Sequence, residues 1–194
     1  MRLRYCVVVD LDYTLIGVDT TTMLGLMICS KTRRILLNLL YMTILRFVIP
    51  ILNKIVARDV YKALLLNICI RCDEGSLNKL ADKAYYKALN YLNTPLVKML
   101  LPVNALKVLL TASIDVIAKR FSTLGFDIVI SSVTKCKDGK VWLLLDLYRN
   151  KHKVLEILLK YCEKIIVFED LPEQQYYRLS NVKVLKVSYH GKKR

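Results

Sequence analysis

The stretch Tyr5-Cys-Val-Val-Val-Asp-Leu-Asp-Tyr-Thr14 decides the fold that we expect for this chain. Its first half is a short run of apolar, mostly β-branched residues, and such a run predicts a strand buried on both faces of a parallel sheet. Two carboxylates, Asp10 and Asp12, follow where this strand would end. Because open α/β sheets bind ligands beyond the carboxyl ends of their strands, we expect a functional site beside these two acids.

The rest of the chain predicts strands and helices in alternation, apart from one long helical insert. Further elements are expected as strands at Leu106–Leu110, Ile128–Ile130, Val141–Leu145, Ile165–Phe168 and Val182–Val187, a turn at Asp138-Gly139-Lys140, and helices at Asp115–Leu124 and Lys151–Tyr161. Between Thr20 and about Leu101 the apolar residues recur at helical spacing instead. The alternation predicts an α/β fold with a mostly parallel sheet, and the insert follows its first strand.

The composition is basic and apolar at the same time. The 194 residues include 31 Lys or Arg against 16 Asp or Glu, a formal net charge of +15, and 55% of them are hydrophobic. So large an apolar share excludes a disordered chain, and the length fits one domain or a compact core with one insertion. The excess charge indicates an anionic partner, for which nucleic acid, a membrane surface and a phosphorylated substrate are the alternatives.

Ile35–Leu52 is the most apolar part of the insert. It is shorter than the roughly 20 residues that span a bilayer, and Arg46 and Pro50 interrupt it, so we expect no transmembrane helix. Two interpretations stay open: a buried or dimerising helix, or an interfacial helix in the headgroup layer of a membrane. Thr20–Arg58 holds several Lys and Arg but no acid, which suits an anionic lipid surface and equally a solvated basic rim.

Six cysteines are scattered along the chain, and no secretory signal precedes the first strand. We therefore expect a reduced, cytoplasmic protein, with peripheral contact at the inner membrane face as an open alternative. Cys69-Ile-Arg-Cys72 has the spacing of a zinc or redox pair. No second pair follows it, so helix packing is the favoured interpretation of these two cysteines.

Four groups of polar side chains follow the expected strands or open the last helix. They are acids at Asp10 and Asp12, hydroxyls at Thr111 and Ser113, lysines at Lys151 and Lys153, and acids at Glu169 and Asp170. Because parallel strands end at one edge of the sheet, we expect these groups to converge. Crowded carboxylates need a cation, and Mg²⁺ prefers oxygen ligands. A nucleophile, a phosphate-binding hydroxyl, a lysine and a metal ligand together indicate phosphoryl transfer.

The order and spacing of these residues resemble the haloacid dehalogenase (HAD) superfamily. Asp10–Thr14 is similar to its first motif, Asp-x-Asp-x-Thr, while Thr111, the lysines and Glu169-Asp170 are similar to its later motifs. The insert resembles the helical cap of the phosphoserine-phosphatase-like branch, and the opening from Asp10 to Thr20 also resembles phosphatidylglycerophosphatases of the C type. The resemblance implies a Rossmann-like three-layer α/β core of residues 1–18 and 102–194, with an all-helical cap of residues 19–101.

The resemblance also implies roles for single residues. Asp10 would be the nucleophile that forms an aspartyl-phosphate, and Asp12 the general acid and then the base. Thr111 would hydrogen-bond a phosphoryl oxygen, with Ser113 in support. Mg²⁺ would be held by Asp10, Asp170 and the backbone carbonyl of Asp12.

The catalytic lysine of the family has two candidates in this chain. We favour Lys153, because a branched residue follows it directly and an apolar one follows four positions later. Lys151 also has an apolar residue four positions on, but His152 would then take the packed position next to it.

Three further acids are candidates for the site. The fourth motif departs from the commonest family pattern, so Glu169 and Glu173 join Asp170 as candidates for binding the metal. Asp19 is expected either to contact substrate or to cap a helix.

The function that we predict from the sequence is a Mg²⁺-dependent phosphatase acting on a small phosphorylated metabolite or a lipid headgroup phosphate. Alternatives are a basic nucleic-acid-binding protein, suggested by the charge and by Gly191-Lys-Lys-Arg194, and a non-catalytic HAD-like binding protein. The basic residues are dispersed and no nucleic-acid recognition motif is present, which disfavours the nucleic-acid interpretation.

Overall fold

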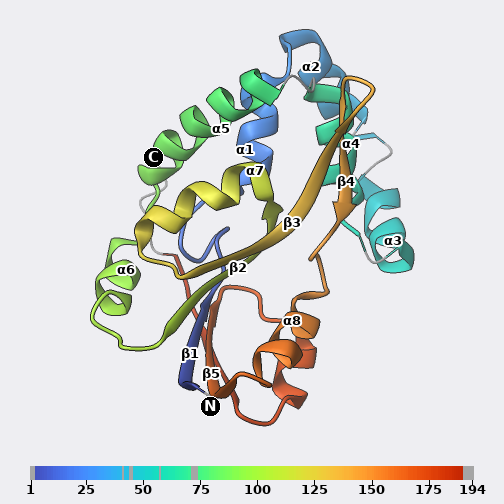
Figure 1. Cartoon of the computed structure of the whole chain (residues 1–194). Coiled ribbons are helices and arrows are strands. Elements are labelled where there is room, and N and C mark those ends of the chain that lie inside the picture. The colour runs from blue at the N-terminus through green and yellow to red at the C-terminus, as the bar shows by residue number, and fades with distance from the viewer. Residues whose placement is uncertain (1–2, 41, 44–45, 57, 71–73, 190–194) are drawn as a thin grey trace.

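Strand β1 (Leu3–Val9) lies in the middle of the sheet, as its apolar run predicts. The computed structural model describes residues 3–40, 42–43, 46–56, 58–70 and 74–189. The other strands of these residues are β2 (Leu106–Ile114), β3 (Ile128–Lys137), β4 (Lys140–Leu145), β5 (Cys162–Glu169) and β6 (Val182–Lys186). Their order is β4-β3-β2-β1-β5-β6, and only the β3–β4 pair is antiparallel (Figure 1). The predicted mostly parallel sheet is therefore confirmed.

Both faces of β1 are covered, which makes the fold three-layered. Val7 and Val9 belong to one buried cluster, whereas Cys6 and Val8 belong to the other. This division follows from the period of two in a strand, because successive side chains point to opposite faces. The continuous apolar run Cys6–Val9 therefore reflects burial on both sides of the strand.

The two predicted core helices lie where the sequence places them, and α8 is shorter than expected. They are α7 (Asp115–Ala118), continued by the 3₁₀ helix η2 (Lys119–Leu124), and α8 (Lys151–Leu158). A short 3₁₀ helix that was not predicted, η3 (Gln174–Arg178), follows β5. The single helix expected at Asp115–Leu124 is therefore α-helical for one turn and 3₁₀ thereafter. Leu155 and Leu158 of α8 pack in the same cluster as Val8, so α8 covers one face of the sheet.

The regular elements of the insert, within the residues that the structure describes, are all helices. They are α1 (Thr20–Ile28), α2 (Lys31–Leu40), α3 (Arg46–Val56), α4 (Val60–Cys69), α5 (Glu74–Leu89) and α6 (Thr94–Leu100). Leu24 of α1 and Leu65 of α4 share a buried cluster with Val9 of β1, so the insert packs on the other face of the sheet. The boundaries at residues 18 and 102 stay a prediction, because this apolar cluster continues across them.

The apolar stretch Ile35–Leu52 falls into two helices. α2 ends at Leu40 and α3 begins at Arg46, with Pro50 inside α3. Within the described part of the chain, none of the helices has both the length and the apolar character needed to cross a bilayer.

The β3–β4 hairpin joins the core to the insert. Its turn is the predicted one, since Asp138 and Gly139 both have positive φ, as a tight hairpin turn requires. Figure 1 shows the hairpin rising beside α4. Just beyond β4, Asp146 forms a buried ion pair with Lys62 of α4, with 2.5 Å between Oδ1 and Nζ. The hairpin therefore connects the two parts through charge as well as packing.

Two disulfides join described cysteines in pairs, so the expectation that these cysteines are reduced is wrong. Cys6 of β1 is bonded to Cys162 of β5, and Cys29 after α1 is bonded to Cys69 of α4. Packing brings each pair together from distant parts of the sequence, which spacing alone does not reveal. Disulfides are typical of oxidising compartments and also of intracellular proteins of hyperthermophiles, so they do not decide the location. Cys72 and Gly191–Arg194 lie outside the described residues.

Candidate active site

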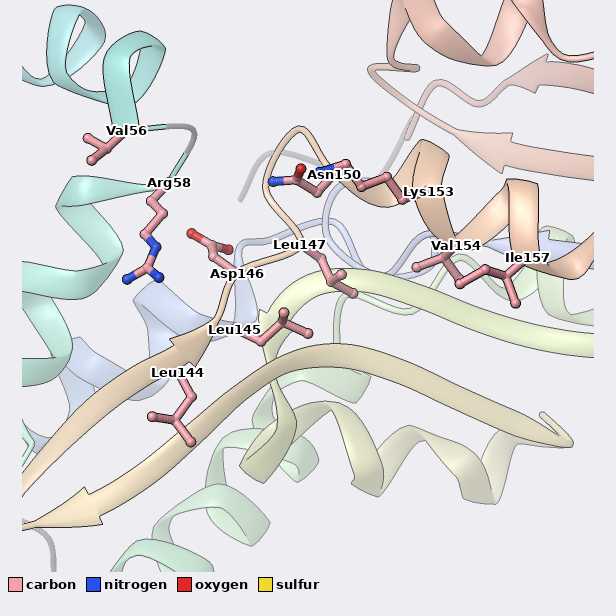
Figure 2. A pocket seen from close by; sticks show the side chains of 10 residues that line it. All are labelled: Val56, Arg58, Leu144, Leu145, Asp146, Leu147, Asn150, Lys153, Val154 and Ile157. Carbon is pink, nitrogen blue, oxygen red and sulfur yellow. The ribbon is translucent and has the colours of Figure 1, made fainter.

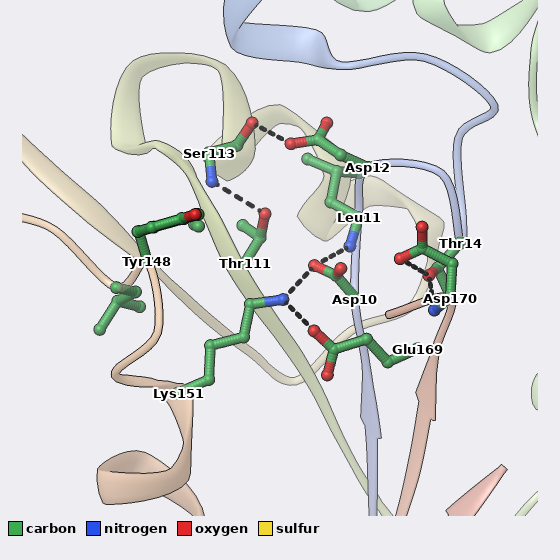
Figure 3. A network of polar contacts seen from close by, with 12 residues as sticks. Asp10, Leu11, Asp12, Thr14, Thr111, Ser113, Tyr148, Lys151, Glu169 and Asp170 are labelled. Carbon is green, nitrogen blue, oxygen red and sulfur yellow. Dashed lines mark hydrogen bonds and ion pairs between the residues drawn. The ribbon is translucent and has the colours of Figure 1, made fainter. Parts of the chain in front are cut away.

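A pocket of about 420 Å³ opens at the carboxyl ends of β1, β2 and β5 (Figure 3). Asp10, Thr111 and Glu169 line it. Asp10 directly follows β1 and Glu169 ends β5, while Thr111 lies in β2, two residues beyond the last residue of that strand paired with β1. The convergence expected at one edge of the sheet is therefore present. Its volume is in the range typical of small-ligand sites.

Lys151 lies between two carboxylates at the centre of this pocket. Its Nζ is 2.8 Å from Asp10 Oδ1 and 2.7 Å from Glu169 Oε1 (Figure 3). Asp10 Oδ1 also accepts a hydrogen bond from the backbone N–H of Leu11 at 2.8 Å. All three charged groups are buried.

The ion pairs oppose the effect of burial on these groups. Burial raises the pKa of Asp10, and Lys151 lowers it only in part. Burial also raises the pKa of Glu169, to about 7, against the effect of Lys151. Although burial disfavours the ammonium, the two carboxylates raise the pKa of Lys151 above its ordinary value. Lys151 therefore stays charged, which holds a positive group directly beside Asp10.

The structure places Lys151 in this position and not Lys153, which corrects our expectation. Lys151 is the first residue of α8, and side chains there lean back past the helix N-terminus, toward the strand ends. Lys153 lies two residues further on, a rotation of about 200° around the helix. It is exposed and lines a different cavity, beside Asn150 and Ile157 (Figure 2).

The N-terminus of α8 is held by Glu173. Glu173 Oε1 accepts a hydrogen bond from the backbone N–H of Lys151 at 3.1 Å, and Oε2 accepts one from that of His152 at 3.3 Å. The ring Nδ1 of His152 also lies 2.8 Å from Oε2. Glu173 thus stabilises the helix that carries Lys151, since an anion is favoured at a helix N-terminus. These contacts engage both carboxylate oxygens of Glu173, which we had considered as a ligand for the metal ion.

Asp12 is held through both of its oxygens. Oδ1 accepts hydrogen bonds from the backbone N–H and the hydroxyl of Thr20, both at 2.8 Å, and Oδ2 accepts one from Ser113 at 2.7 Å (Figure 3). Burial, with Asp19 and Asp10 nearby, raises the pKa of Asp12 to about 7. Asp12 is therefore an oriented carboxyl that exchanges a proton near neutral pH.

The position of Ser113 differs from our expectation that it binds phosphate. Its hydroxyl lies 2.6 Å from Thr20 Oγ1 and 2.9 Å from Thr21 Oγ1, in addition to its bond to Asp12. The residue is buried, and the pocket is lined by Thr111 and Ala112 instead. Ser113 thus orients Asp12. Strand alternation would place Ser113 on the same face as Thr111, but the register of β2 against β3 shifts between Leu110 and Ile114, so the contacts of Ser113 follow from this irregular part of the strand.

Thr14 joins the ends of β1 and β5. Its hydroxyl accepts a hydrogen bond from the backbone N–H of Asp170 at 2.9 Å, and its Oγ1 lies 3.5 Å from Asp170 Oδ1. Asp170 therefore lies on the rim of the pocket, close enough to Asp10 to contribute to the raised pKa of that carboxyl.

Asp19 caps α1, which is one of the two roles expected for it. Its side chain accepts a hydrogen bond from the backbone N–H of Thr22 at 2.6 Å. Asp19 also lines the pocket, so its charge acts on Asp12 from the insert.

The donor chemistry of the pocket fits Mg²⁺. Among the described residues, no three His, Cys, Asp or Glu side chains are placed so that they could already hold a metal ion. The described lining nevertheless carries two cationic side chains, Lys151 and Arg149, and seven carboxylates: Asp10, Asp12, Asp19, Asp59, Glu169, Asp170 and Glu173. A phosphate entering such a pocket would meet mostly negative charge, which a hard divalent cation with oxygen ligands would offset.

Sequence reasoning missed two parts of this pocket. Tyr148 and Arg149 line it from the loop before α8, with the Arg149 guanidinium 5.3 Å from the Tyr148 ring centre. Arg149 and Tyr13 both have φ in the left-handed region, at 57° and 59°, and such strain is concentrated at functional sites. No motif predicts Tyr148 and Arg149, because their approach to the pocket depends on how the loop before α8 folds.

Solved structures share this fold at low sequence identity. A phosphoserine phosphatase from T. onnurineus in complex with NDSB-201 has a TM-score of 0.58 at 17% identity, covering 94% of this chain and 84% of that one. Cytosolic 5′-nucleotidase IIIB bound to cytidine has a TM-score of 0.59 at 14% identity, covering 95% and 73%. A HAD family hydrolase from Salmonella enterica serovar Typhi has a TM-score of 0.50 at 16% identity, covering 87% and 57%.

These similarities establish the fold and leave the reaction to the site itself. The chain has the HAD-like α/β fold, with a helical insert after the first strand, as the sequence predicts. No family model and no curated protein matches the sequence. None of the three structures is a phosphatidylglycerophosphatase, so the resemblance to the C type of that enzyme stays a prediction.

Proposed function

We propose that this protein is a Mg²⁺-dependent phosphomonoester hydrolase that acts through an aspartyl-phosphate on Asp10. One observation carries the proposal: Lys151 is held at 2.8 Å from Asp10 and 2.7 Å from Glu169, at the carboxyl ends of parallel strands. A buried cation beside a buried carboxylate would stabilise negative charge arriving on a phosphate at that point.

The first step makes a bond between Asp10 and phosphorus. The described contacts of Asp10 with Lys151 and Leu11 both reach Oδ1, so we assign the attack to Oδ2. As the Asp10–phosphorus bond forms, the bond from phosphorus to the leaving alcohol oxygen breaks, and Asp12 gives that oxygen a proton. The raised pKa of Asp12, about 7, leaves it protonated in part of the molecules at neutral pH.

The second step releases phosphate. Asp12, now deprotonated, takes a proton from water as the water oxygen attacks phosphorus, and the bond from phosphorus to Asp10 breaks. The hydrogen bonds from Thr20 and Ser113 keep the Asp12 carboxylate in one orientation for both proton transfers.

Mg²⁺ would supply charge neutralisation for the phosphate among the carboxylates. Asp10, Asp170 and the backbone carbonyl of Asp12 would hold it. Thr111, buried within β2 and lining the pocket, would donate a hydrogen bond to a phosphoryl oxygen. Glu169 is better suited to hold Lys151 in place than to bind metal, because Oε1 is engaged by the lysine.

The substrate class that we propose is a small phosphomonoester or a headgroup phosphate. The pocket of about 420 Å³ has room for such a group, and Tyr13 and Arg149 at its mouth would contact the part beyond the phosphate.

Release of phosphate from an aryl phosphate, with and without Mg²⁺, tests this proposal. We expect Mg²⁺-dependent turnover that Asp10→Asn abolishes and that Asp138→Asn, a matched change on the exposed β3–β4 turn, leaves unchanged. Asp12→Asn should accumulate phosphorylated protein, detected by intact mass. Full activity in Asp10→Asn would exclude Asp10 as the nucleophile, and a wild-type protein inactive on a panel of phosphomonoesters would exclude the function.

A further inference from the structure

Helix α3 presents its apolar face outward. Phe47, Ile51 and Ile55 follow one another at spacings of four and are 68%, 62% and 75% exposed. Of the residues of this helix that the structure describes, only Ile49 and Asn53 are buried. An amphipathic helix on a globular protein ordinarily turns its apolar face to the core. The orientation of α3 is the opposite, so its apolar face lacks cover within the described chain.

The outward face extends beyond these three residues. Val48, Leu52 and Val56 are exposed next to them, and we call these six residues of α3 the α3 face. On α2 and just after it, Ile35, Leu39 and Met42 are exposed at spacings of four and three, in the same segment of the chain.

A cavity of about 430 Å³ adjoins the α3 face (Figure 2). It lies between Val56 and Arg58 of the insert, β4, and α8 with Lys153 and Ile157. Figure 2 shows Arg58 extending from the insert into this gap. The apolar surface therefore continues onto the core, with a basic side chain contributed by each part.

The charged residues of α2 and α3 have one sign. Arg46 and Lys54 are exposed on α3, on the stripe that Pro50 also occupies, beside the apolar residues. Lys31 and Arg33 are exposed on α2. No acidic residue occurs in the whole sequence from Thr20 to Arg58. Whatever covers this apolar face must therefore accept a rim of positive charge.

We propose that the α3 face docks on an anionic lipid bilayer, with α3 lying in the headgroup layer. The apolar residues would enter the boundary between headgroups and acyl chains, while Arg46 and Lys54 would contact lipid phosphates. A second copy of the chain is the main competing occupant. A symmetric dimer would bring the same residues of two copies together, and hence the same basic rims face to face. The charge pattern thus favours the bilayer.

Flotation of the full-length protein with vesicles tests this docking. We expect the wild type to float with vesicles of phosphatidylcholine and phosphatidylglycerol, to float far less with phosphatidylcholine alone, and to be released by salt. Arg46→Gln/Lys54→Gln should weaken binding roughly 30-fold, at about fivefold for each basic residue near the surface. The control Lys79→Gln/Lys83→Gln, with both changes on exposed positions of α5, should bind like the wild type.

A second pair of variants tests the apolar contribution. Phe47→Ser/Ile51→Ser/Ile55→Ser should weaken binding by about 100-fold or more. The control Tyr86→Ser/Tyr161→Ser/Tyr177→Ser removes side chains of similar exposure from other elements and should leave binding unchanged. Circular dichroism checks that both variants are folded.

Three outcomes would overturn the docking proposal. The first is a wild type that does not float with anionic vesicles, and the second is an α3 triple variant that floats as well as the wild type. The third is a wild-type dimer in sedimentation that the α3 triple variant converts to a monomer, without any flotation, which would assign the face to a second copy. Asp10→Asn should float like the wild type. A protein that floats yet hydrolyses no phosphomonoester would refute the proposed function and leave the docking intact.

Discussion

Replacing Lys62 by Met should destabilise the protein strongly, because it breaks a buried ion pair between the insert and the core. The Lys62 ammonium lies 2.5 Å from Asp146 Oδ1 and donates to the Ala112 carbonyl at 2.8 Å. The side chains of both partners are buried, at 7% and 1% exposure. Removing one partner leaves a buried charge without its counter-ion, at a cost of about 3–5 kcal/mol.

Three further donors reach Asp146 besides Lys62. The backbone N–H of Asp59 donates to Oδ2 at 2.8 Å, while Ser132 Oγ and the backbone N–H of Tyr148 donate to Oδ1, each at 3.1 Å. Asp59 and Tyr148 also line the pocket. Loss of the pair should therefore loosen the pocket wall as well as lower the free energy of unfolding.

Thermal and urea unfolding measure the size of this effect. In a chain of this length, each kcal/mol corresponds to about 2–4 °C, so Lys62→Met should lower Tm by roughly 6–20 °C. Lys119→Met removes an exposed lysine whose Nζ lies 3.8 Å from Asp115, and it should change stability by less than about 0.5 kcal/mol.

A double-mutant cycle makes the reasoning refutable. Lys62→Met/Asp146→Asn should cost less than the sum of the two single changes, by about 2 kcal/mol, because neither charge is then left alone. If the costs add within about 0.5 kcal/mol, or if Lys62→Met costs less than about 1 kcal/mol, the pair does not join the insert to the core as argued.

The remaining predictions concern the lysine of the active site, the stability of the protein in acid and one disulfide. Lys151→Met should lower kcat/KM on an aryl phosphate by about 100-fold or more, while the exposed Lys153→Met changes it less than about twofold; the reverse order would refute the assignment of the lysine. Burial alone would raise the pKa of Asp146, but Lys62 holds it below the ordinary value of 3.8. The ion pair with Lys62 therefore stabilises the fold fully above about pH 4, and this stabilisation is lost in stronger acid as Asp146 is protonated. The free energy of unfolding in urea should therefore fall less steeply with acid in Asp146→Asn than in the wild type, and an equally steep fall would contradict this. Cys29→Ala/Cys69→Ala opens a loop closed over a sequence separation of 40 and should cost roughly 4 kcal/mol in the same assay; an unchanged midpoint would refute a stabilising role.

The sequence alone determined the strands, the polar residues at their ends and the place of the insert. An apolar run such as Val7–Val9 is stable only between two covered faces, and parallel strands must end at the same edge. Asp10, Thr111 and Glu169 were therefore predictable as neighbours although they are distant in sequence. These conclusions depend only on local sequence patterns, namely apolar runs followed by polar residues, and they do not require knowledge of how the helices pack on the sheet.

Only the tertiary structure decided which side chains meet. Lys151 and Lys153 differ by two positions, and the rotation of α8 places one against Asp10 and the other in a separate cavity. The irregular part of β2 placed Ser113 against Asp12, and the packing of the insert on the sheet brought Lys62 against a buried acid. Such contacts depend on where whole elements come to rest, because ion pairs and hydrogen bonds act over a few ångströms and sequence spacing does not report that distance.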